Sequence, residues 1–262
     1  MTTGTEERSR KSVTIARRFN GPPRSANGGY ACGITAGPLT ERTGHAAEVS
    51  LRMPPPVEHP LTLEIADQRG TLADGEALIA EARPAKVDLT PPEPVSLAEA
   101  EAAARDFSID PFRATSPFPG CFTCGPDRDD GNGLRIFPGR VDRDETIVAW
   151  PWIPDPSLDA GDGRVDTATV WAALDCPSGW AWYHQPGPHP PHVLGRMAAQ
   201  IHHRPACGQP AVAAAWPLGE ASRKRFSASA LWSAEGTLLA CARATWIALS
   251  EEQMEQFAAQ VS

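Results

Sequence analysis

The sequence lacks several features that would define its class directly. It contains no apolar run that approaches the roughly 20 residues of a membrane-spanning helix, so no span is expected. Lysine and arginine form no basic stripe and the formal net charge is −8, which argues against a nucleic-acid-binding surface. The N-terminal segment MTTGTEERSRKS has no apolar core, so it is not expected to be a secretory signal. These absences together predict a cytoplasmic protein.

The sequence also lacks the dense cysteine pattern of a disulfide scaffold. Its 6 cysteines are scattered and are predicted to be free thiols or small core residues in a reducing compartment. Cys121-x-x-Cys124 has the spacing of a metal or redox pair. A second ligand pair would have to come from His202, His203 or Cys207, and none of these forms a clean pair spacing. A structural turn is therefore favoured, and no metal or redox cofactor is predicted.

Three histidines lie among prolines in YHQPGPHPPHV, namely His184, His189 and His192. Prolines break regular structure, so this segment predicts a loop at the rim of a pocket. His189 is not expected to be a metal ligand.

The first part of the chain, residues 1–95, predicts one helix and several antiparallel strands. Alternating apolar positions predict strands at 12–19, 46–53, 61–67 and 77–89, and Pro84 predicts a bulge or an edge in the last of these. The helix is predicted in RSANGGYACGITAG (24–37), although each interior helical glycine costs about 1 kcal/mol relative to alanine. Gly29, Gly33 and Gly37 recur every four residues on one helix face, which would permit close approach of a neighbouring element.

Residues 96–117 are predicted to be a linker, and residues 118–262 a second unit with the same plan. Ser96 and Glu99 have the spacing of a capping box, and a proline-rich loop follows at 108–120. The second unit predicts strands at 133–141 and 145–152, a helix at 165–176, and a last short helix from Ser250 with Gln253. Four more strands are expected at 193–202, 210–218, 224–233 and 238–249.

An internal repeat supports two copies of one unit. LIAEARPAKVDL (78–89) aligns without a gap on LLACARATWIAL (238–249). The identical pairs are Leu78/Leu238, Ala80/Ala240, Ala82/Ala242, Arg83/Arg243 and Leu89/Leu249. The expected fold class is α+β, with two tandem units that each place one helix against an antiparallel sheet.

This unit resembles the hot-dog fold, in which a sheet wraps a central helix and two units pair to form active sites. Many hot-dog thioesterases begin that helix with His-Gly-Gly and carry an acid nine residues after the His. Asn27-Gly28-Gly29 matches this start with Asn in place of His, while Ala36 occupies the acid position. In the second unit, LDCPSGWAW resembles the segment around the family's catalytic acid, and nine residues before Asp175 lies Asp166. CFTCGPDRDDGNGLRIF (121–137) resembles a stretch that opens many single-unit members of this family.

The resemblance implies a double hot-dog acyl thioester hydrolase with one composite pocket per chain. Gly28 from the first unit would face Asp175 from the second, whereas Thr167 would face Ala36. In this interpretation the N–H of Gly28, with Gly29, is the oxyanion donor, because helix N-termini offer unpaired amides and a partial positive charge. Asp175 would be the general base or the nucleophile, and Asn27 would cap the helix and orient the site.

The substrate implied is an acyl group on coenzyme A or an acyl-carrier protein, with coenzyme A present only as part of the substrate. Tyr30, Trp171 and Trp180 are predicted to shape the acyl pocket. Arg24 and Arg196 are predicted to contact coenzyme A phosphates, and further cations are available in Arg204, Arg223, Lys224 and Arg225. An internal pseudo-dimer is expected, and a homodimer is left open.

Other interpretations remain. The glycines can act in packing alone, and Asp175 can be a helix-end residue that bonds backbone groups before Pro177. A non-catalytic acyl-ligand or partner-binding module is the main functional alternative. A hot-dog hydratase is disfavoured, because that branch places a His five residues after the Asp and Trp180 stands there.

Overall fold

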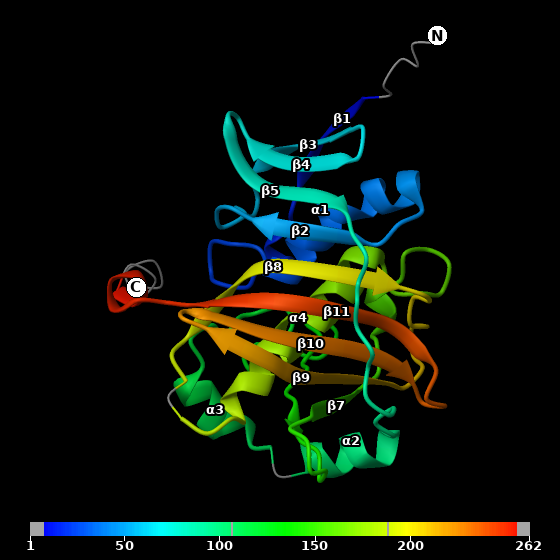
Figure 1. The fold of residues 1–262 in the computed structure, drawn as a ribbon, viewed down its shortest axis with the longest axis vertical. Coiled ribbons are helices and arrows are strands. Elements are labelled where there is room, and N and C mark those ends of the chain that lie inside the picture. Colours follow the sequence, from blue (N-terminus) through cyan, green and yellow to red (C-terminus); the bar gives the residue numbers. More distant parts are fainter. Residues whose placement is uncertain (1–7, 106, 188, 256–262) are drawn as a thin grey trace.

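The computed structural model describes residues 8–105, 107–187 and 189–255 (Figure 1). Its main feature is one 11-stranded sheet with the order β1-β3-β4-β5-β2-β8-β11-β10-β9-β7-β6. The strands of the first half are β1 (Ser9–Thr14), β2 (Ala47–Leu51), β3 (Pro60–Ala66), β4 (Arg69–Asp74) and β5 (Ala77–Pro84). Those of the second half are β6 (Gly139–Arg140), β7 (Val148–Trp152), β8 (His192–Ile201), β9 (Ala211–Ala221), β10 (Lys224–Ser233) and β11 (Leu238–Ala248).

The two halves of the sheet repeat one topology on either side of a central junction. There β2 pairs antiparallel with β8, from Ala47 opposite Ala199 to Ser50 opposite Arg196. Outward from the junction, the order is β2-β5-β4-β3-β1 on one side and β8-β11-β10-β9-β7 on the other. The strands β5 and β11, whose sequences align, therefore occupy equivalent positions. The predicted two-unit α+β architecture is confirmed, while the unit boundaries at 95 and 118 stay a prediction.

Two long helices, α1 (Gly28–Thr43) and α4 (Thr167–Tyr183), lie side by side against one face of the sheet (Figure 1). Their contact is close because α1 carries glycine where α4 approaches. A Cβ at Gly29 would lie 2.5 Å from the Asp175 Cβ, and a Cβ at Gly33 would lie 2.5 Å from the Ala168 Cα. Real side chains do not tolerate such distances, so these glycines are required by the packing of the two helices.

Gly37 does not take part in this packing. A Cβ there would meet nothing within 4 Å, so the expectation that Gly37 packs against a neighbour is wrong. Gly33 faces Ala168 at the start of α4, so Gly37, one turn further along α1, lies beyond this end of α4 and lines a cavity.

The segment between the two halves covers the opposite face of the sheet. Residues 85–97 run from β5 across the strands of the second half to α2 (Leu97–Ala104), followed by α3 (Ile109–Thr115) (Figure 1). Val87 and Val95 are buried there against the outward-facing apolar side chains of β8 and β9. The predicted capping box is present, since Ser96 and Glu99 exchange hydrogen bonds, and Arg143 pairs with Glu99 at 2.8 Å.

Several local predictions differ from the structure. Residues 12–19 divide into the end of β1 and a 3-10 turn (Arg17–Phe19), and β5 ends at Pro84, which has no N–H to donate. β4 was not expected, because its interior Gly70 weakens the strand pattern. The expected strand at 133–141 is irregular except for the two residues of β6.

The helix α4 is longer than predicted. It continues through Pro177 to Tyr183, with Ala181 and Trp182 buried beyond the proline, so tertiary burial overrides the local helix-breaking signal. A second 3-10 turn (Pro156–Leu158) precedes α4. Residues 251–255 form a helix, and Ser250 and Gln253 exchange hydrogen bonds at the start of this helix. The rest of the helix predicted here lies outside the described residues.

No helix within the described ranges combines the length and apolarity needed to cross a membrane.

Candidate active site

The site is built where α1 begins against the middle of α4. Asn27 is the N-cap of α1, and its Oδ1 accepts a hydrogen bond from the Tyr30 N–H at 2.9 Å. The backbone N–H of Asn27 donates to the Phe19 carbonyl at 2.8 Å, which holds the chain as it enters the helix. Asn27 is buried, and its side chain forms the hydrogen bond that is typical of asparagine at an N-cap. The predicted capping role is confirmed.

Asp175 comes from the centre of α4 and faces the first turn of α1. Its Oδ2 accepts a hydrogen bond from the Gly29 N–H at 2.9 Å, across the interface of the two halves. The side chain is buried, and Oδ1 has no hydrogen-bond partner among the described residues. Burial raises the pKa of Asp175 to about 7, while the Gly29 N–H and the Asn27 side chain lower it and negative charge on Cys121 raises it further.

The two glycine amides differ in their availability. The Gly29 N–H is occupied by Asp175, so it holds the carboxylate. The Gly28 N–H is a first-turn amide of α1, and within the described ranges it has no protein partner. Gly28 also lines a cavity. The Gly29 amide therefore holds the Asp175 carboxylate, and the role of Gly28 as an oxyanion donor stays a prediction.

This cavity has a volume of about 350 Å³ and lies between the two halves. Asn27, Gly28 and Asp175 all line it, together with Leu194 from β8 and Trp246 from β11. Its lining combines apolar side chains with a few convergent polar groups, as in sites for small molecules.

The residues predicted to shape the acyl pocket lie elsewhere. Tyr30 points into the core, where its ring stacks on Phe19 at a centroid distance of 4.0 Å. Trp171 lines a second cavity at the start of α4, towards the other end of the helix pair. Trp180 lies in an aromatic cluster with Phe112 of α3, at 4.9 Å between ring centroids. Trp180 follows Asp175 by five residues and faces another side of α4, whereas Trp171 shares the face of Asp175 but lies one turn nearer the start of the helix and the second cavity.

Neither predicted phosphate-binding arginine lines the cavity itself, although Pro22 and Ser25 near Arg24 and Gly195 beside Arg196 do. Arg24 is exposed on the loop before α1. Arg196 projects from β8 on the side of the sheet opposite the helices, where it donates to Ser50 Oγ at 3.0 Å and pairs with Glu48 at 3.6 Å. The alternation of side chains along β8 directs Leu194 toward the cavity, and the irregular pairing at Gly195 precedes the outward-facing Arg196.

The sequence predicts His192 only in a loop at a pocket rim, whereas the structure places it in the cavity lining. It begins β8 and packs on Trp246 and Tyr183, with ring-centroid distances of 5.0 and 5.1 Å. Burial lowers the pKa of His192 to about 4, so the ring is neutral at pH 7. One sequence signal indicates this position. The alternating pattern of the strand extends back through Leu194 and Val193 to His192, which places His192 in the strand and not in the proline-rich loop.

Cysteines also meet at this site in a way that sequence spacing did not reveal. The Sγ atoms of Cys121, Cys124 and Cys176 all lie within 4.8 Å of one another, and those of Cys121 and Cys176 are 3.7 Å apart. The third member is Cys176, the neighbour of Asp175, while His202 and His203, which the sequence offered without a clean pair spacing, line the second cavity. Cys121 and Cys176 line the same cavity as Gly28.

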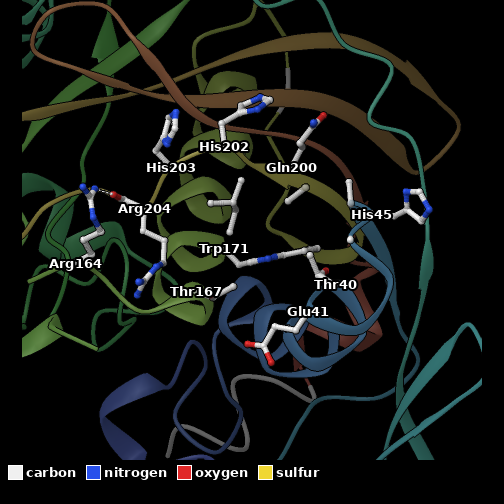
Figure 2. Close-up of a pocket in the computed structure, with 15 residues that line it drawn as sticks. Thr40, Glu41, His45, Arg164, Thr167, Trp171, Gln200, His202, His203 and Arg204 are labelled. Carbon is white, nitrogen blue, oxygen red and sulfur yellow. Dashed lines mark hydrogen bonds between the residues drawn. The ribbon is translucent and has the colours of Figure 1, made fainter. Parts of the chain in front are cut away.

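The second cavity occupies the equivalent place at the start of α4 (Figure 2). It has a volume of about 530 Å³ and is lined by Thr167 and Trp171 of α4, with further polar side chains from α1 and the end of β8. Asp166 caps α4 by accepting from the Thr169 N–H at 3.0 Å. The position equivalent to Asp175 is Ala36, which is fully buried, so no carboxyl group stands there. The two helix starts therefore differ in the groups that they offer to a ligand.

No protein-family model matches the chain, and no curated protein sequence matches it. Solved structures do match over nearly its whole length. The tesB protein of Mycobacterium avium subspecies paratuberculosis is similar at 12% identity, with a TM-score of 0.62 over 95% of this chain and 96% of that one. A protein of unknown function with a hot-dog fold from Alicyclobacillus acidocaldarius is 12% identical, with a TM-score of 0.57 over 92% and 93%.

A third similar structure is the dehydratase domain of a mycocerosic acid synthase-like polyketide synthase. It is 14% identical, with a TM-score of 0.61 over 95% of this chain and 94% of that domain. At such identities the similarity establishes the fold alone. The chain has a double hot-dog fold, in agreement with the resemblance seen in its motifs.

Proposed function

We propose that this protein hydrolyses an acyl thioester in the cavity between its two halves. The observation that carries the proposal is the Gly28 N–H, free at a helix start, beside a buried carboxyl group that the next amide holds in place at 2.9 Å. Thioester hydrolysis needs a donor for the developing oxyanion and a group that delivers the nucleophile. Gly28 and Asp175 supply these from different halves of the chain.

The reaction follows from this arrangement. The thioester carbonyl oxygen binds at the Gly28 N–H. Leu194 of the cavity wall packs against Gly28, where a Cβ would lie 3.0 Å from the Leu194 Cβ. Asp175 then either removes a proton from water as that water attacks the carbonyl carbon, or attacks this carbon itself to form a mixed anhydride that water cleaves. In both routes the thiol leaves as coenzyme A or as the thiol of an acyl-carrier protein. Hydroxylamine would trap the second route as a hydroxamate on Asp175.

The roles of the supporting residues are narrower than those expected from the sequence. Asn27 fixes the helix start, and Gly29 fixes the carboxylate. Leu194 and Trp246 supply apolar lining for the acyl chain. The protein is proposed to act in the cytoplasm, where its six cysteines, none of which forms a disulfide, would remain reduced.

The test is thiol release over a panel of acyl-coenzyme A substrates, with Asp175→Asn as the main variant. General acid–base catalysis contributes about 10²- to 10⁴-fold, so we expect the rate to fall by about 100-fold or more. Asn retains an oxygen for the Gly29 N–H, which limits the effect on folding. Asp166→Asn is the matched control, because this acid caps the other helix, and it should retain the wild-type rate within a few-fold. Equal rates for wild type and Asp175→Asn would refute the mechanism.

A second candidate is hydration or dehydration of an acyl chain. His192 shares the cavity with Asp175, and a neutral imidazole beside a carboxyl group can move protons on adjacent carbons. An enoyl-thioester assay with His192→Gln distinguishes this activity from thiol release. If wild type is inert in both assays while an acyl-thioester analogue raises its melting temperature, the protein is a binding module.

A further inference from the structure

We propose that Cys121, Cys124 and Cys176 form a zinc site that binds one ion per chain at the wall of the active-site cavity. The site is independent of the thioesterase proposal, because it depends on the thiol cluster alone. The described part of the chain contains no other group of three or more converging His, Cys, Asp or Glu ligand atoms.

The separations of the sulfur atoms suit zinc. Bonds of about 2.3 Å in tetrahedral geometry place two zinc-bound sulfurs about 3.8 Å apart. The Cys121 and Cys176 sulfurs are already 3.7 Å apart, and Cys124 lies within 4.8 Å of both. A disulfide would use only two thiols, whereas three meet here, and Cys-x-x-Cys is the usual spacing of a zinc ligand pair.

The turn that carries Cys121 and Cys124 (residues 121–125) is held against α4. Thr123, between the two cysteines of the turn, donates from Oγ1 to the Ala172 carbonyl of α4 at 3.0 Å, and both groups are buried. The Gly125 N–H donates to the Cys121 carbonyl at 2.8 Å. A Cβ at Gly125 would lie 2.4 Å from that carbonyl oxygen, so only glycine permits this turn. The ligands are therefore positioned by rigid contacts with the helix that carries Cys176.

A side-chain amide lies beside two of the three sulfur atoms. The Asn27 Nδ2 donates to Cys176 Sγ at 3.7 Å and to Cys121 Sγ at 3.9 Å. Hydrogen-bond donors to metal-bound sulfur are a usual outer shell of such sites. Zinc binding would release the protons that the thiols still hold.

Three protein ligands leave the fourth position of tetrahedral zinc to a non-protein ligand. Cys121 and Cys176 both line the cavity, so water or a bound small molecule can reach this position.

The experiment measures metal binding by the full chain. Reduced protein stripped with a chelator is titrated with Zn²⁺ against a chromophoric chelator, and with Co²⁺ as a spectroscopic probe of thiolate ligation. We expect one ion per chain and a thiolate-to-cobalt charge-transfer band. Cys124→Ser and Cys176→Ser should each weaken binding by more than about 100-fold, since outer-shell partners alone contribute about 10- to 100-fold. Cys207→Ser and Cys241→Ser alter thiols outside the cluster and should bind as wild type does.

Melting temperatures without metal show whether each variant folds. Cys124 is half-buried, so Cys124→Ser tests the site even if Cys176→Ser does not fold. Absence of stoichiometric binding by reduced wild type overturns the proposal, as does equal binding by Cys124→Ser. A Cys121–Cys176 disulfide in untreated protein, together with no zinc binding after reduction, would instead identify a redox pair. Neither result depends on thioester turnover, so this proposal and the proposed function can fail separately.

Discussion

At the scale of single residues, burial decides which groups are charged at the site. Asp175 and His192 line one cavity, and burial moves their pKa values in opposite directions, to about 7 and about 4. In both cases the low-polarity surroundings penalise the ionised form. The cavity therefore favours the neutral forms of both groups more strongly than water does, and His192 contributes an uncharged ring.

His192 predicts an acid-side loss of stability. Its pKa in the folded protein is about 4, against about 6.5 in the unfolded chain, so between these pH values the unfolded state binds more protons. The His192 contribution to the free energy of unfolding should therefore rise by about 3 kcal/mol from pH 4 to 6.5, whereas Asp175, whose pKa is raised to about 7, contributes in the opposite direction over this range. In denaturant titrations at several pH values, the unfolding free energy of wild type minus that of His192→Gln should therefore rise with pH. His203→Gln changes an exposed ring and should keep the wild-type slope; the same slope in His192→Gln would contradict the assignment.

At the scale of secondary-structure elements, the contact between α1 and α4 explains why a buried helix contains so much glycine. Gly29 and Gly33 bring the backbones together, and this approach lets the Gly29 N–H reach Asp175. The periodic glycines predicted close packing, and the structure confirms it for Gly29 and Gly33. The sequence did not reveal that Gly37 lies outside the contact, since the register in which α1 lies against the start of α4 is not a local property.

Two glycine substitutions test this contact. Gly33→Ala would place a Cβ 2.5 Å from the Ala168 Cα, and such overpacking typically costs about 1 to 3 kcal/mol of unfolding free energy. Gly37→Ala adds a methyl group in open space and should change stability by less than about 1 kcal/mol. Denaturant unfolding of the two variants provides the measurement. Similar losses in both would show that the helices do not pack as closely as described.

At the scale of the whole molecule, the two halves share one sheet and one helix interface. β2 pairs with β8 at the centre, and residues 85–97 cross the second half on the other face. Neither half buries its central strand edge or its helix without the other. This continuity is what places a first-half amide and a second-half carboxyl group in one cavity.

Cooperative unfolding should follow from this continuity. All 8 tryptophans lie at position 150 or later, so tryptophan fluorescence reports on the second half and on its contact with α1, whereas far-ultraviolet circular dichroism reports on both halves as a whole. We expect the two probes to give the same denaturation midpoint, as in a two-state transition. A fluorescence midpoint clearly separated from the circular dichroism midpoint would show that the halves unfold independently.

The sequence by itself determined the features that depend on local spacing. The repeat between 78–89 and 238–249, the cap at Asn27 and the small-residue face of α1 could all be predicted, because periodicity and capping act within a few residues. Pairing Gly28 with Asp175 required the family resemblance as well, and the structure brings these residues to one cavity. The tertiary structure alone decided which glycine amide is free, that Tyr30, Trp171 and Trp180 lie outside that cavity, and that Cys176 joins Cys121 and Cys124. These outcomes depend on how α4 lies against α1 and on the path of the turn at 121–124. Both are set by packing between segments that are distant in the sequence, so local residue spacing does not predict them.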